Sequence, residues 1–166
     1  MFLEKNNKAL VTFLMSSTLT SFGSSGQSIT PVEFDIWEKD RFIGALSKKT
    51  YFQYVTDPGE HLFIARGGNW SFVKANLDAG KRYYIFVNLY PSFMRRHGVV
   101  FQPVKKEDKE LISEIPEYLS ELKAMSVIGT KHKEYERNKV EEIKNEIKIF
   151  ETTEYGFSSL EPQDGF

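Results

Sequence analysis

The sequence has 166 residues, of which 40% are hydrophobic and 14% aromatic, so it can form one packed domain plus an appendage and is not expected to be disordered throughout. The 22 Lys and Arg residues balance 23 Asp and Glu residues, and a net charge of -1 excludes the broad positive field of a nucleic-acid-binding protein. The sequence contains no cysteine, which excludes disulfides, thiolate nucleophiles, cysteine-ligated zinc and a lipid-attachment cysteine within it.

The first predicted element is a buried strand at residues 9–15, a short apolar run that includes β-branched residues. Lys5 and Lys8 precede this run and small residues follow it, which is also the pattern of a secretory signal. Because the run is short and interrupted by Thr12, we interpret it as a strand. Residues 16–26 are rich in serine, threonine and glycine and predict a loop. No apolar stretch reaches the roughly 20 residues needed to span a bilayer, so no transmembrane segment is expected.

Seven further runs with strand character follow, separated by turn sequences. They occupy residues 32–37, 42–46, 51–55, 61–65, 70–77, 82–90 and 98–104. The strongest turn signal is Asp57-Pro58-Gly59, because proline presets φ and glycine tolerates a positive φ. No helical pattern separates the strands to support parallel crossovers. The sequence therefore predicts a mainly β domain over residues 1–104, an antiparallel β-sandwich of about seven to eight strands.

A C-terminal helical extension is predicted for residues 105–150, where charged and apolar residues recur at helical spacing. The apolar face of its first helix consists of Leu111, Ile115, Leu119, Leu122 and Met125. Pro116 should kink this helix or begin a new one. We expect the apolar face of this helix to pack within the chain.

A second helix is predicted from about Lys131, with a narrow apolar stripe on a highly charged surface. The stripe consists of Val140, Ile143, Ile147 and Phe150. An apolar stripe must be buried against something, and we expect this one to contact a partner protein or a second copy of the chain. Residues 151–166 contain two glycines and a proline and predict a loop or tail.

Four motifs in residues 32–90 occur in an order that suggests a known family. They are Asp40-Arg41-Phe42-Ile43-Gly44-Ala45-Leu46, Thr50-Tyr51-Phe52, Pro58-Gly59-Glu60-His61 and Ala79-Gly80-Lys81-Arg82-Tyr83-Tyr84. This pattern resembles a family of small bacterial proteins of unknown function that are often predicted envelope lipoproteins. The resemblance implies a transthyretin-like or prealbumin-like β-sandwich and a setting in the cell envelope or periplasm, and it supplies no catalytic residues. The sequence departs from the family in lacking a lipobox cysteine and a clear export signal, and a cytoplasmic location is expected if Met1 is the native start.

Catalytic and metal-binding patterns are absent from the sequence. His61, His97 and His132 lie far apart, and none belongs to an HxH or HExxH motif that would preset the spacing of metal ligands. The serines of the N-terminal loop have no GxSxG elbow. The sequence therefore predicts neither an enzyme nor a cofactor.

Two classes of binding function remain. The first is a structural or adaptor module, a subunit of a larger assembly that uses its sheet edges and the stripe of the second helix as contact surfaces. The alternative is a ligand-binding domain for carbohydrate, lipid headgroup or peptide, because exposed aromatic rings and a basic loop can both bind ligands. Its candidate residues are Trp37, Trp70, Arg95, Arg96 and His97. The tryptophans could equally be core residues and the basic cluster a solvated loop, and burial of both tryptophans would remove the main basis of the alternative.

Overall fold

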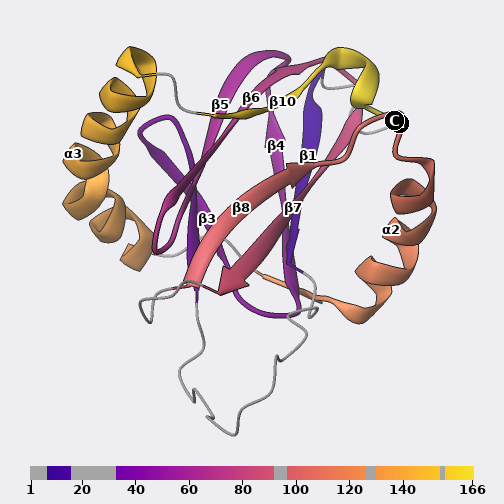
Figure 1. Cartoon of the computed structure of the whole chain (residues 1–166), viewed down its shortest axis with the longest axis horizontal. Helices are drawn as coiled ribbons and strands as arrows, with labels where there is room; N and C mark the ends of the chain where they lie inside the picture. The colour runs from indigo at the N-terminus through magenta and orange to yellow at the C-terminus, as the bar shows by residue number, and fades with distance from the viewer. Residues whose placement is uncertain (1–6, 16–32, 92–96, 126–129, 154–155) are drawn as a thin grey trace, which may run out of the picture.

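The computed structural model describes residues 7–15, 33–91, 97–125, 130–153 and 156–166. Within these ranges the protein is mainly β, with ten strands in two five-stranded sheets and two α-helices. Figure 1 shows the helices on opposite sides of the sheets. This arrangement confirms the prediction of a mainly β protein with a helical C-terminal part.

The first sheet has the strand order β8-β7-β1-β4-β9. Its strands are β1 (Ala9–Met15), β4 (Thr50–Thr56), β7 (Arg82–Pro91), β8 (His97–Pro103) and β9 (Lys123–Ala124). The N-terminal run is thus a central strand, antiparallel to β4 and parallel to β7. Its burial on both faces explains why it is almost uniformly apolar.

The second sheet has the strand order β10-β6-β5-β2-β3. Its strands are β2 (Phe34–Glu38), β3 (Arg41–Leu46), β5 (Gly59–Arg66), β6 (Trp70–Leu77) and β10 (Ser158–Leu160). All eight strands predicted between residues 9 and 104 are present in the two sheets. The expectation of purely antiparallel pairing was wrong, because β1 with β7, β4 with β9 and β6 with β10 are parallel pairs.

The main core lies where the two sheets face each other. The ring of Phe13 on β1 lies 5.0 Å from that of Phe52 on β4 and 5.2 Å from that of Phe63 on β5, measured between centroids. All three side chains are almost fully buried. The Phe13–Phe52 contact lies within the first sheet and the Phe13–Phe63 contact joins the two sheets, and inward-facing aliphatic residues surround them.

Helix α2 (Lys109–Glu121) covers the outer face of the first sheet. Ile115 is buried there against a cluster that includes Leu14 and Phe86. The predicted packing of this helix within the chain is therefore confirmed. Pro116 lies inside a continuous helix, so of the two predicted outcomes, a new helix or a kink, the new helix does not occur.

Helix α3 (Thr130–Thr152) covers the outer face of the second sheet. Ile143 is fully buried and Phe150 nearly so, against Trp37, Ile64 and Phe72 of the sheet. The expectation that this stripe contacts a partner is corrected here. Outward-facing apolar residues on the sheet require a cover, and the stripe provides it.

Polar contacts also hold α3 in place. Arg66 on β5 donates two hydrogen bonds, 3.0 and 3.1 Å long, to the carboxylate of Glu142. It also donates to Asp35 on β2 at 3.2 Å, and Tyr135 of α3 donates to the same carboxylate. Burial and the hydrogen bond to Asp35 raise the pKa of Tyr135, so its hydroxyl remains a donor.

The C-terminal residues belong to the fold and are not the loop or tail that the sequence predicted. After α3, β10 pairs with β6 at the edge of the second sheet, and the 3-10 turn η1 (Pro162–Asp164) follows. Phe166 then exchanges two backbone hydrogen bonds, 2.9 and 3.0 Å long, with Arg82 of the first sheet. The segment therefore connects the two sheets.

Candidate functional site

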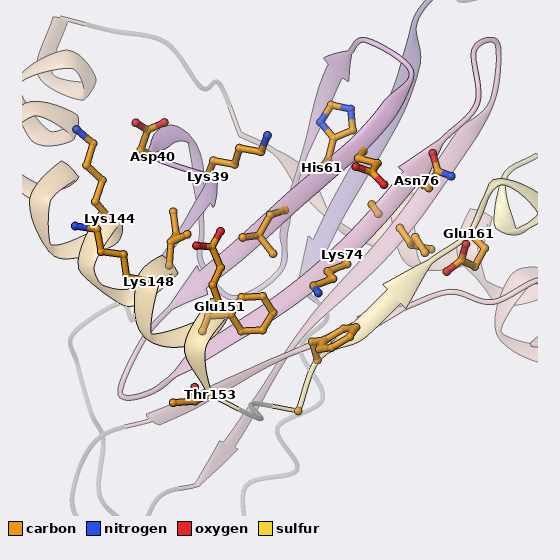
Figure 2. Close-up of a pocket in the computed structure, with 18 residues that line it drawn as sticks. Lys39, Asp40, His61, Lys74, Asn76, Lys144, Lys148, Glu151, Thr153 and Glu161 are labelled. Carbon is orange, nitrogen blue, oxygen red and sulfur yellow. The ribbon is translucent and has the colours of Figure 1, made fainter.

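An open groove lies between the C-terminal half of α3 and the outer face of the second sheet (Figure 2). Its volume is about 1200 Å³. Strands β5, β6 and β10 contribute to its floor, and the end of α3 with Gly156 and Phe157 forms one side. Its apolar lining residues are Leu62, Ala75, Ile147, Phe150, Phe157 and Leu160.

The strand register explains why the groove is open. Ile64 pairs with Phe72 across β5 and β6, and both lie beneath α3. Two residues along, the next outward-facing pair is Leu62 with Lys74, and Ser159 of β10 is the other neighbour of Lys74. Helix α3 covers Ile64 and Phe72 but leaves the row of Leu62 and Lys74 partly open. The side chains of Leu62 and Lys74 therefore line the groove.

An aromatic ladder forms the wall of the groove nearest to α3. Phe72 and Phe150 stack with centroids 4.2 Å apart, and Phe157 meets Phe150 edge to face at 5.9 Å. The Lys74 ammonium lies 4.4 Å from the centroid of Phe157 and 5.5 Å from that of Phe150. Phe157 is 51% exposed, which is high for so large an apolar side chain.

Both signs of charge line the groove. Its cations include Lys39, Lys74, Lys144 and Lys148, and its carboxylates are Asp40, Glu60, Glu151 and Glu161. Lys144 forms an ion pair with Glu141 at 3.5 Å. Within the described ranges, the other three lysines and all four carboxylates have no ion-pair partner. The Glu161 carboxylate accepts a hydrogen bond from the backbone N–H of Asp164 in the 3-10 turn, whereas the other unpaired charges can pair with a ligand.

A polar cluster of Glu38, Tyr54 and His61 closes one end of the core beside the groove. Tyr54 donates to one oxygen of Glu38, and Nδ1 of His61 contacts the other. Nε2 of His61 lies 2.8 Å from the backbone oxygen of Asp57. Both ring nitrogens thus face acceptors, an arrangement that only the imidazolium form satisfies.

The pKa values in this cluster follow from its hydrogen bonds. The bond to Glu38 raises the pKa of His61 despite the opposing effect of burial. Burial alone would raise the pKa of Glu38, but the bonds from His61 and Tyr54 outweigh it and lower that pKa. Burial and the bond to Glu38 raise the pKa of Tyr54 to about 12. The directions of these shifts favour a charged His61–Glu38 pair beside a neutral phenol.

The cluster predicts a defined dependence of stability on pH. The contribution of His61 is complete below its ordinary pKa of 6.5 and is lost as pH rises through the raised value, whereas that of Glu38 is complete above 4.5 and is lost in acid. We expect the free energy of unfolding of the wild type to exceed that of His61→Gln most between these two values, and the difference to shrink at alkaline pH. Urea unfolding across this pH range tests it. In Glu38→Gln, the free energy of unfolding should no longer fall at alkaline pH through His61. If the wild type and His61→Gln differed by the same free energy at every pH, the ion pair would be contradicted.

The cluster offers little for catalysis, because the polar atoms of Glu38 and His61 are already engaged with each other, Tyr54 and Asp57. A general base needs a free nitrogen or oxygen within reach of its substrate. Among the residues with described positions, no group of three or more His, Asp or Glu side chains is placed to hold a metal ion.

Of the predicted ligand-binding residues, the structure describes the side chains of Trp37 and Trp70. Trp37 is fully buried under α3, and its Nε1 has no acceptor among the described residues, so it cannot stack on a ligand at the surface. Trp70 is half-buried in the same cluster, with the Arg66 guanidinium 5.8 Å from its ring. Arg95 and Arg96 lie outside the described residues, as does the side chain of His97. The correction concerns Trp37 alone, because α3 closes the surface above it to solvent, whereas Trp70 keeps part of its surface exposed.

The groove uses other residues, which the sequence interpretation placed elsewhere or did not single out. Ile147 and Phe150 were assigned to a partner contact and instead contribute to its lining. Phe157 fell in the predicted tail, and Lys74 was one charged residue in a predicted strand. One signal for the groove was present in the sequence. Lys74 and Phe72 are two residues apart and so lie on the same face of their strand, and the change from an apolar to a charged residue on that face indicates where the covered surface ends.

No family model matches the chain, and no curated protein or solved structure matches it. Neither described helix is long and apolar enough to cross a membrane. The groove, with its exposed aromatic ring and unpaired charges, is therefore the feature from which a function can be inferred.

Proposed function

We propose that the chain is a non-enzymatic adaptor module, a subunit of a larger assembly that binds an extended peptide segment of a partner protein in the groove. The observation that carries this proposal is a groove of about 1200 Å³ in which a half-exposed Phe157 adjoins unpaired charges of both signs. Pockets for drug-sized molecules occupy about 300–1,000 Å³. A larger, open and amphipathic groove suits several residues of a peptide.

The chemistry of the lining favours a peptide over the other ligand classes considered. The apolar residues of the groove can receive side chains of a ligand, while the lysines and carboxylates around them can pair with ligand charges of either sign. The carbohydrate alternative relied on stacking by the two tryptophans, of which Trp37 is buried and Trp70 half-buried, and neither lines the groove. The phosphate of a lipid headgroup is negatively charged, and the four carboxylates of the groove would repel it even though lysines are also present.

We also propose that the two sheets form a β-sandwich of the transthyretin-like kind and that the module works in the bacterial cell envelope. The support is the resemblance of residues 32–90, together with the division of strands β1 to β8 into four in each sheet around a shared core. An experimental structure and fractionation of the native source would test the two parts separately.

The peptide proposal predicts that groove variants lose binding. Random-peptide display against the full chain should yield peptides whose affinity falls about tenfold or more in Phe157→Ser, because a central aromatic contact is lost. Val55→Ser is the matched control, since Val55 is 46% exposed on the first sheet, outside the groove. Calorimetric titration measures the affinities, and circular dichroism checks that both variants fold. Failure to select any peptide, or equal loss in both variants, would count against the proposal.

A further inference from the structure

Lys74 differs from the other unpaired lysines of the groove in how its ammonium is held. It projects from β6, the middle strand of the floor (Figure 2). Its neighbours on the adjacent strands are Leu62 on β5 and Ser159 on β10. Two aromatic rings, Phe150 and Phe157, hold the ammonium at 5.5 and 4.4 Å from their centroids. A ring face attracts a cation but leaves its other donors open, so the ammonium can still bind an anion.

The surrounding charges restrict which anion can bind there. In the described structure no carboxylate lies within ion-pair distance of Lys74, although Glu60, Glu151 and Glu161 also line the groove. These three groups and Asp40 at the other end of the lining (Figure 2) would repel a ligand that carries several negative charges. A ligand with a single carboxylate, flanked by apolar or basic groups of the same ligand, avoids that repulsion.

We infer that Lys74 anchors a single carboxylate of the ligand, and that the groove selects peptide segments in which this carboxylate adjoins an apolar side chain. The inference rests on the proposed function, whose ligand class it narrows. The carboxylate accepts a charge-assisted hydrogen bond from the Lys74 ammonium, and the neighbouring apolar side chain packs on Phe157. The carboxylate belongs to an Asp or Glu side chain or to the C-terminus of the segment.

The test uses the full chain and a peptide obtained by display. Lys74→Gln should weaken binding roughly tenfold and reduce its dependence on salt, whereas Lys74→Arg should retain most of the affinity. Lys48→Gln, an exposed lysine outside the groove, should leave the affinity unchanged. Changing the acidic residue of the peptide to its amide, or amidating its C-terminus, identifies which carboxylate binds.

The two levels of the proposal fail differently. If Phe157→Ser weakens binding and Lys74→Gln does not, peptides bind the groove but the anchor assigned to Lys74 is wrong. If neither variant changes the affinity, the groove itself is not the binding site. Equal binding of the peptide with and without its carboxylate would also overturn the anchor.

Discussion

Replacing Asp164 with alanine is expected to lower the free energy of unfolding by about 2–4 kcal/mol. Asp164 is 1% exposed and accepts hydrogen bonds from the Lys105 ammonium and from the backbone N–H groups of Lys106 and Glu161, the last two at 3.0 and 2.8 Å. Without the carboxylate, these donors lose their acceptor. The loss falls below that for a fully buried ion pair because the Lys105 side chain, 35% exposed, can regain water.

Urea unfolding at neutral pH measures this effect, with Gln163→Ala as the control on the same turn because Gln163 is exposed. The dependence on pH provides a second check. Burial alone would raise the pKa of Asp164, but the bonds from Lys105 and the two backbone groups lower it. Its stabilisation is therefore present above the ordinary pKa of 3.8 and is lost as pH falls through the lowered value. Equal stability of the wild type and Asp164→Ala at neutral pH would show that the C-terminal segment is not clamped in solution.

The strands of the two sheets were predictable because their signals are local. The turn at Asp57-Pro58-Gly59 separates β4 from β5, and Gly59 has a φ of 115°, a conformation that favours glycine. The short strands β9 and β10 were missed because two or three residues carry no alternation. Their pairing depends on partners that only the folded chain brings close.

The role of the C-terminal segment could not be predicted from its composition. Pro162 and Gly165 favour a loop in any sequence, and nothing local indicates that Asp164 meets Lys105, 59 residues earlier. The groove is equally non-local, since its lining comes from the β2–β3 turn, three strands and α3. Sequence patterns identify faces of elements, but not which faces remain open after packing.

The position of α3 illustrates this limit. Its stripe showed that the helix must be buried, while Phe34, Ile36 and Trp37 showed apolar residues on both faces of β2. Apolar residues on both faces indicate a strand covered on both sides. The two signals together would have placed α3 on the second sheet, whereas each alone permits an external partner.

Replacing Ile143 with aspartate is therefore expected to destabilise the isolated chain by about 3–5 kcal/mol, because an unpaired carboxylate would enter a fully buried apolar site. Urea unfolding followed by tryptophan fluorescence measures this, since the variant should expose Trp37 to water. Asn145→Asp, the same new charge at an exposed position of α3, is the control and should change stability by less than about 0.5 kcal/mol. A stripe that served only a partner would give the opposite result, with stability unchanged and association lost.

The same variant also tests how the cover of the sheet relates to the groove. Ile143 does not line the groove, yet one and two turns further along α3 Ile147 and Phe150 do. A helix detached at Ile143 would no longer hold Phe150 against Phe72, and the wall that supports Phe157 and Lys74 would be lost. We therefore expect Ile143→Asp to abolish peptide binding without removing any group that touches the ligand. Retention of full affinity would show that the groove does not depend on α3.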